Sequence, residues 1–238
     1  MPVSIPVLKF LIWIEEETVK SCEAGIKSEW FDHKLRFNLT GFIANYKRLQ
    51  SPQIGSNLTP PYPGLVVSAV YDLDAKGVEM ELAAAPFHGL TLNGGLGYTS
   101  WKTSNINPLN INNHEVINIP HWTGNTSALY QTDPLFGTAR LVFSLNGSWR
   151  SRERVDGYSI PLPAEFRAQQ FSRAGWILNG RIALKDVQMA HGGNVELALW
   201  AKNITNSDRI AYLIDFNAFQ SAIYEAARTY GFDASFHF

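Results

Sequence analysis

Hydrophobic and polar side chains alternate along most of the chain, and this period of two residues predicts β-strands that each have one apolar face. The alternation is clearest at the C-terminal end, over residues 230–238. There the apolar face would hold Tyr230, Phe232, Ala234, Phe236 and Phe238. The same pattern predicts further strands over residues 18–30, 35–46, 66–85, 90–98, 122–131, 141–149, 176–185 and 195–201. Strands of about ten residues are longer than is usual in a soluble domain and long enough to cross a bilayer at a tilt.

The connections between these strands alternate in length. Short turns are predicted at residues 32–33, 86–89, 133–137 and 186–193, and long loops over residues 51–64, 103–120, 151–173 and 205–228. Residues 219–228 are compatible with a helix, and a switch of the apolar face at Lys76–Gly77 predicts a β-bulge. All the short turns fall at the same end of the strands as Phe238, and all the long loops at the other.

Short periplasmic turns and long external loops are typical of a bacterial outer-membrane β-barrel. The predicted fold is therefore all-β, an antiparallel transmembrane β-barrel segment of about nine long strands. The chain has no apolar run of about 18 residues, so no transmembrane helix is predicted. Its formal net charge of −1 gives no reason to expect a nucleic-acid partner. Cys22 is the sole cysteine, which excludes a disulfide within the chain.

The first fifteen residues differ from the rest. Residues 3–14 are apolar, are interrupted by Pro6 and Lys9, and continue into the acidic run Glu15–Glu17. A secretory signal would have a small-residue cleavage site at this point. We therefore expect residues 1–15 to be an atypical segment without a functional signal peptide, which conflicts with an outer-membrane destination.

Several motifs in residues 16–238 are similar to those of one known family. The most specific is Trp200-Ala-Lys-Asn-Ile-Thr-Asn206, which resembles the penultimate-strand motif of TonB-dependent receptors. Further pieces that look like the same family, in the same order, lie at residues 17–27, 42–50, 76–82, 120–125 and 228–232. The terminal Phe238, with Phe236 and Tyr230 before it, resembles the signal that the outer-membrane assembly machinery recognises.

The resemblance implies a function in uptake. The family has a 22-stranded barrel around a globular plug, and it takes up ferric siderophores, cobalamin and other scarce ligands with energy transmitted by TonB. The similarity covers only the C-terminal portion of that barrel, without the plug, so a truncated reading frame is expected. An odd number of strands and two open edges favour a fragment over a complete barrel. The implied partners are outer-membrane lipid and lipopolysaccharide, the assembly machinery through Phe238, a small-molecule ligand, and TonB only if the plug is present.

Arg150, Arg152 and Arg154 are the candidate ligand contacts, because arginine pairs bidentately with anionic groups such as those of ferric siderophores. The competing interpretation is a solvated loop in which Glu153 and Asp156 balance the charge. Aromatic residues near the strand ends are predicted to anchor the barrel at the two membrane interfaces. They are Trp30, Tyr98, Trp101, Trp122, Trp149 and Trp176.

Other functions have weaker support in the sequence. Glu79 and Glu81 lie on one strand face and could form a glycosidase pair, although a polar barrel wall explains them as well. The six histidines have no metal-ligand spacing, and no cofactor or enzymatic activity is predicted. Two alternatives remain open: a complete small porin-like barrel, and a soluble β-sandwich enzyme. The barrel interpretation predicts that the isolated chain forms inclusion bodies.

Overall fold

The computed structural model describes residues 16–55, 65–104, 116–155, 170–190, 192–215 and 220–237. These residues form thirteen β-strands and no α-helix. The strands are β1 (Thr18–Trp30), β2 (Leu35–Gly55), β3 (Leu65–Ala84), β4 (Leu90–Ser104), β5 (Trp122–Gln131), β6 (Arg140–Arg150), β7 (Glu153–Arg154), β8 (Phe171–Ser172), β9 (Gly175–Gln188), β10 (Asn194–Lys202), β11 (Ile210–Asp215), β12 (Gln220–Tyr224) and β13 (Thr229–His237). Among the described residues, no helix is long and apolar enough to cross a membrane.

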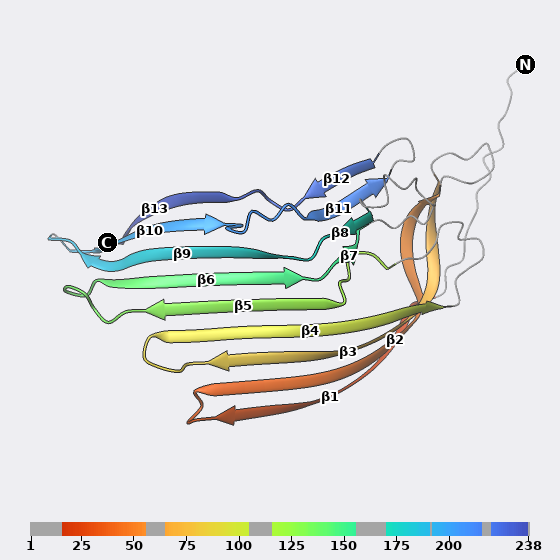
Figure 1. The fold of residues 1–238 in the computed structure, drawn as a ribbon, viewed down its shortest axis with the longest axis horizontal. Helices are drawn as coiled ribbons and strands as arrows, with labels where there is room; N and C mark the ends of the chain where they lie inside the picture. Colours follow the sequence, from red (N-terminus) through yellow and green to blue (C-terminus); the bar gives the residue numbers. More distant parts are fainter. Residues whose placement is uncertain are drawn as a thin grey trace, which may run out of the picture.

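Nine strands form one antiparallel sheet in the order β1-β2-β3-β4-β5-β6-β9-β10-β13. These are the nine strands that the alternation predicts, so the predicted fold class is confirmed. Figure 1 shows them side by side in a single curved layer. The sheet does not close on itself, because β1 and β13 each pair on one side only.

The sheet has an apolar outer face. Residues that lie opposite one another across strands keep the same character, as in the row Ile26, Leu39, Met80 and Leu96. A second such row contains Phe143, Ile182, Leu199 and Phe232. All eight side chains are exposed. A contiguous exposed apolar surface of this kind requires a partner, and for a barrel strand that partner is lipid.

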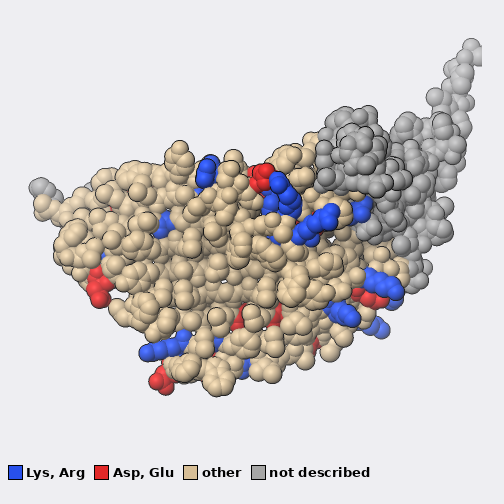
Figure 2. Space-filling view, in the orientation of Figure 1, with Lys and Arg blue, Asp and Glu red and all other residues tan. Residues whose placement is uncertain are grey.

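Polar and charged side chains gather on the inner face. Asn38 donates a hydrogen bond to Glu81 Oε2 at 3.0 Å, between β2 and β3. Arg181 of β9 donates to Glu196 of β10, and Lys185 Nζ lies 3.2 Å from the other oxygen of the same carboxylate. Figure 2 shows one face of the sheet, where uncharged residues dominate and most charged side chains lie toward the rim.

The two ends of the sheet differ in construction. Short turns connect β1 to β2, β3 to β4 and β5 to β6 at one end, which we call the turn end, and the chain also finishes there (Figure 1). The opposite end, which we call the loop end, carries the longer connections. Two of these connections are not the plain loops predicted from sequence. They contain the β7–β8 and β11–β12 pairs.

Three details of the sequence-based prediction are wrong. Residues 51–55 continue β2 and pair with residues 65–69 of β3 instead of forming part of a loop. Gln220–Tyr224 is a strand that pairs with β11, so the described part of residues 219–228 is not helical. There is no bulge at Lys76–Gly77, because both residues pair in continuous register with β2 and β4.

The register shift in this part of the sheet lies in β2, between Tyr46 and Leu49. Arg48, inside the shift, has a φ of +55°. Its backbone N–H donates to Asp72 Oδ1 at 3.0 Å, and Lys47 Nζ forms a 2.9 Å ion pair with Asp72 Oδ2. Asp72 of β3 therefore stabilises the irregular stretch.

A change of environment explains the switch of apolar face in β3. Beyond Lys76, toward the loop end, Tyr71 and Leu73 are buried on the inner side of the sheet. They form a small core, the loop-end core, with Tyr46, Leu49, Trp101 and Val116. The apolar side chains thus point outward where the strand crosses the lipid and inward where it continues past it.

Candidate functional site

The predicted contact arginines lie where β6 leaves the sheet at the loop end. The Arg152 guanidinium carbon is 3.9 Å from the centroid of the Phe171 ring, and that of Arg154 is 5.8 Å from the same centroid. Stacking of guanidinium groups on an aromatic face is attractive. Phe171, which lies in β8, therefore gathers two of the three predicted arginines into one place.

The third arginine, Arg150, is half-exposed and lies beside a buried ion pair. Arg150 Nη1 lies 3.7 Å from Glu153 Oε1. The same oxygen accepts a 2.7 Å hydrogen bond from Arg209 Nη2, and the Arg209 and Glu153 side chains are only 5% and 4% exposed. Burial lowers the pKa of the Arg209 guanidinium, whereas the Glu153 carboxylate raises it again. Because arginine titrates far above neutral pH, the Arg209 guanidinium stays charged.

The sequence reasoning missed most of the remaining residues at this position. Arg173 Nη2 binds both oxygens of Asp208, at 3.0 and 2.9 Å, and this pair is solvent-exposed. A cavity of about 440 Å³ lies between these groups, and we call it the arginine pocket. Its lining residues are Arg152, Phe171, Arg173, Asp208, Arg209, Ile210 and Tyr224. No spacing in the sequence could reveal it, since its walls come from two loops that are distant in the chain.

The arginine pocket has the chemistry of an anion site. Three guanidinium groups, two aromatic rings and one carboxylate line its wall. Guanidinium groups present paired N–H donors to carboxylate, hydroxamate-like or phosphate oxygens, and the rings offer flat apolar contact. Nothing in this set provides a nucleophile with an adjacent base, so the arrangement is suited to binding.

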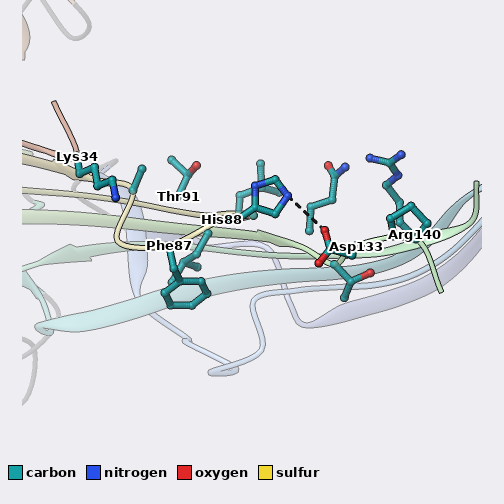
Figure 3. Close-up of a pocket in the computed structure, with 13 residues that line it drawn as sticks. Lys34, Phe87, His88, Thr91, Asp133 and Arg140 are labelled. Carbon is teal, nitrogen blue, oxygen red and sulfur yellow. Dashed lines mark ion pairs between the residues drawn. The ribbon is translucent and has the colours of Figure 1, made fainter. Parts of the chain in front are cut away.

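A second cavity, of about 670 Å³, lies at the turn end. Figure 3 shows Lys34, His88, Thr91 and Arg140 along one side of it, while Phe87 points the opposite way. His88 Nε2 is 3.4 Å from Asp133 Oδ1, but the two side chains are 87% and 84% exposed. Water screens ion pairs of this kind almost completely. This cavity therefore lacks the buried, fixed groups of the arginine pocket.

Aromatic side chains lie on the outer face near both ends of the sheet. At the loop end, Tyr98 and Trp122 are register partners whose rings lie 4.7 Å apart. At the turn end, the Tyr130 and Phe143 rings lie 6.2 Å apart. From Trp122 to Tyr130 the strand rises about 27 Å at ~3.4 Å per residue, which is roughly 20 Å along the membrane normal at the tilt of barrel strands. Trp101 is the exception, because it belongs to the loop-end core and stacks on His121.

The residues of the predicted assembly signal lie on the last strand. Tyr230 and Phe236 are exposed on the outer face of β13. Phe238 lies outside the described residues. Because β13 is an edge strand, its free backbone groups and these aromatic side chains are presented together.

The possible enzymatic and metal sites gain little from the structure. Glu79 and Glu81 are exposed on the inner face, and Glu81 accepts a hydrogen bond from Asn38. In the described part of the chain, no group of three His, Cys, Asp or Glu residues could hold a metal ion. His114 and His191 lie outside that part.

Comparison with known families decides the assignment. The family model "TonB dependent receptor-like, beta-barrel" matches residues 13–204. The chain belongs to the TonB-dependent receptor family. This family consists of receptors and transporters rather than enzymes.

Solved structures share the fold. The ferric preacinetobactin receptor BauA of Acinetobacter baumannii is 16% identical, with a TM-score of 0.63 over 92% of this chain and 29% of that one. The ferric yersiniabactin uptake receptor FyuA of Yersinia pestis is 15% identical, with a TM-score of 0.67 over the same shares. The pyoverdine outer membrane receptor FpvA of Pseudomonas aeruginosa is 13% identical, with a TM-score of 0.61 over 94% and 30%. This chain thus spans less than a third of the length of these receptors.

The TonB-dependent receptor motif at residues 200–206 has a clear structural role. Asn203 is buried, has a φ of +49°, and donates hydrogen bonds from Nδ2 to the carbonyl oxygens of Ser207 and Ala226, at 2.9 and 2.8 Å. Its Oδ1 accepts from Ser207 N–H at 2.8 Å, and its own N–H donates to Asn179 Oδ1 at 2.9 Å. One asparagine therefore connects β9, β10 and both ends of the last loop, which carries Asp208 and Arg209 of the arginine pocket.

Proposed function

We propose that this chain is the C-terminal barrel portion of an outer-membrane receptor for TonB-dependent uptake of a scarce ligand, such as a ferric siderophore or cobalamin. The family match over residues 13–204 carries the proposal. The siderophore receptors with the same fold favour an iron chelate as the ligand. No observation favours the small porin-like barrel or the soluble sandwich enzyme, and no second sheet covers the nine-stranded one among the described residues.

The rest of the receptor, including the plug, is supplied by sequence outside this chain. Two observations support this part of the proposal. The sheet has open edges at β1 and β13, which a complete barrel would join to further strands. The chain also corresponds to only 29% of the length of BauA and FyuA.

Translation of the DNA upstream of residue 1 in all three frames tests this proposal. We expect a plug, a TonB box and a signal peptide in the same frame or in a shifted one. The mass of the protein that the gene produces is then measured in isolated outer membranes. We expect a polypeptide of the size of a full receptor. An intergenic region with its own promoter, together with a product of about the mass of this chain, would contradict the proposal.

We assign ligand contact to the arginine pocket and to Arg150, Arg152 and Arg154.

Deletion of the gene is expected to abolish energised uptake of radioactive iron presented as one of three chelates: a hydroxamate, a catecholate or a carboxylate. Restoration of the gene should restore uptake of that chelate alone. Unchanged uptake of all three, together with loss of cobalamin uptake, would assign the receptor to cobalamin instead.

Assembly in the membrane depends on the last strand in this proposal. Phe238, Phe236 and Tyr230 are the contacts to the barrel assembly machinery, and the aromatic borders are the contacts to lipid and lipopolysaccharide. Replacement of Phe238 by alanine should lower the amount of receptor in the outer membrane without altering its synthesis. An unchanged outer-membrane level would exclude Phe238 from this role.

A further inference from the structure

The Glu153–Arg209 ion pair joins four separate segments at the loop end. The Arg209 guanidinium contacts Glu153 of β7, Ser172 Oγ of β8 at 3.4 Å and the carbonyl oxygen of Gly175 at 3.5 Å. The backbone carbonyl of Arg209 accepts a 2.9 Å hydrogen bond from Glu225 N–H, just after β12. The β6–β9 connection and the β10–β13 connection therefore meet at this one side chain.

Burial makes this contact different from the other ion pairs of the loops. Glu153 and Arg209 are almost inaccessible, and their neighbours Val155 and Ser172 are 0% and 1% exposed. Within the described residues, Glu153 Oε2 has no hydrogen-bond partner, so Arg209 is the main group that compensates the buried carboxylate. If one member of such a pair is removed, the other is left buried without a counter-charge, which is strongly unfavourable.

The geometry also connects this pair to the arginine pocket. Arg209 lines the pocket, and Glu153 lies between Arg152 and Arg154, which stack on Phe171. Movement of Glu153 away from Arg209 would therefore displace β7 and with it the Arg152 side of the pocket. The Asp208 and Tyr224 side of the pocket would stay with the β10–β13 connection, whereas Arg173 belongs to the same connection as β7.

We propose that the Glu153–Arg209 pair is a positioning latch that holds the two loops together so that the arginine pocket exists before ligand arrives. Glu153 does not line the pocket, so it acts through Arg209 and not by touching ligand. The inference rests on the proposed function only for the identity of the ligand, because the contact between the loops is a property of the receptor alone.

Trypsin digestion of the receptor in isolated outer membranes tests the latch. The variants are made at the gene's own locus. In Glu153→Gln, we expect cleavage after Arg152, Arg154 and Arg173 to become about tenfold faster or more, because the unpaired Arg209 side chain must leave its buried position. The matched control is Asp208→Asn, which breaks the exposed Arg173–Asp208 pair between the same two loops. Cleavage in this control should change less than about twofold.

A double variant shows whether the two side chains act as a pair. Glu153→Met combined with Arg209→Met removes both charges, and it should bring cleavage after Arg152 back to within about threefold of the wild-type rate. If Glu153→Gln cleaves at the same rate as the Asp208→Asn control, or if the double variant cleaves as fast as Glu153→Gln, the latch is wrong. If neither Glu153→Gln nor the double variant gives assembled receptor, the latch is also wrong, because the whole barrel would then require the pair.

Uptake kinetics provide a readout that general loss of structure would not give. With the chelate that the wild-type receptor takes up, Glu153→Gln should raise KM about tenfold and leave the maximal rate unchanged, since only the bound geometry is affected. A fall in the maximal rate at constant KM would contradict a positioning role. If the wild type takes up none of the three iron chelates or cobalamin, the proposed function fails, whereas the protease result still decides the latch.

Discussion

Backbone conformation shapes the turn end of the sheet, and buried side chains shape the loop end. Gly89, in the turn between β3 and β4, has a φ of +80°, and a Cβ at this position would lie 2.1 Å from the carbonyl oxygen of Gln131. The charged groups nearby, such as His88 and Asp133, are almost fully exposed. At the loop end, by contrast, Asn203, Glu153 and Arg209 are buried and bonded to several segments each.

The difference follows from what each end has to do. A turn needs only to reverse the chain, and a residue that accepts positive φ is sufficient for that. A ligand site needs side chains from distant segments at fixed positions, and this requires buried polar groups that restrain the loops. Substitutions at the turn end should therefore act through the backbone, and those at the loop end through lost contacts.

The largest effect is expected for Asn203→Ala. The change removes three hydrogen bonds that the buried Asn203 side chain makes to the backbone of Ser207 and Ala226. We expect the local free energy of unfolding to fall by about 3 kcal/mol. Hydrogen exchange followed by mass spectrometry, on peptides from residues 200–213, measures this loss.

Asn206→Ala is the matched control for this substitution. Asn206 has a φ of +52°, close to that of Asn203, but its side chain is exposed. Only the cost of an alanine in the left-handed region remains, about 1 kcal/mol. Equal losses in the two variants would show that the hydrogen bonds of Asn203 contribute nothing.

The next effect is expected at the turn end for Gly89→Ala. The new methyl group would meet the Gln131 backbone, and the 2.8 Å bond from Gln131 N–H to the Gly89 carbonyl would be strained. We expect a loss of about 2 kcal/mol in stability. Guanidinium unfolding of the receptor in detergent measures this loss.

Gly192→Ala is the matched control. Gly192 has a φ of +89°, but no atom lies within 4 Å of an added Cβ, so the loss of stability should be about half as large. A larger loss for Gly192→Ala than for Gly89→Ala would refute the steric explanation.

A smaller effect is expected for Arg152→Ala, and it concerns binding rather than stability. The substitution removes the guanidinium that lies 3.9 Å above Phe171 in the arginine pocket. We expect KM for uptake to rise about tenfold, or about 1.4 kcal/mol. Arg36→Ala, which removes an exposed arginine paired with Glu29 near the turn end, should leave KM unchanged. An equal rise in both variants would indicate a general charge effect and not a site.

The smallest effect is expected for His88→Gln. The substitution removes the contact to Asp133, which water screens almost completely. The guanidinium midpoint should equal that of the wild type. A lower midpoint in the variant would show that the contact between His88 and Asp133 stabilises the turn end after all.

Much of the sheet could be predicted from the sequence because its information is local. The period of two residues placed all nine long strands and both faces, and turn residues located the reversals. Residues 51–55 continue a strand despite Pro52 because they pair with residues 65–69. Such pairing is not visible in the local pattern. The bulge was misplaced for the same kind of reason, since the apolar face of β3 changes when its surroundings change from lipid to the loop-end core.

The candidate site was only partly predictable. Arg152 and Arg154 were found from charge alone, but their partner Phe171 lies in another segment of the loop. Glu153 was interpreted as a solvated counter-charge, whereas the structure buries it against Arg209, 56 residues further along the chain. No periodicity or spacing in the sequence encodes a contact at that separation. The β7–β8 and β11–β12 pairs, which create it, are too short to give a pattern.

The order of the strands has a consequence for folding. Every long strand pairs with its neighbours in the chain, apart from the two steps over β7–β8 and β11–β12. This topology has a low relative contact order, so the conformational search for each hairpin is short. The edge strand β13 keeps an unsatisfied row of backbone groups until a partner strand arrives. The time course of biogenesis should therefore be governed by insertion and by closure of this seam.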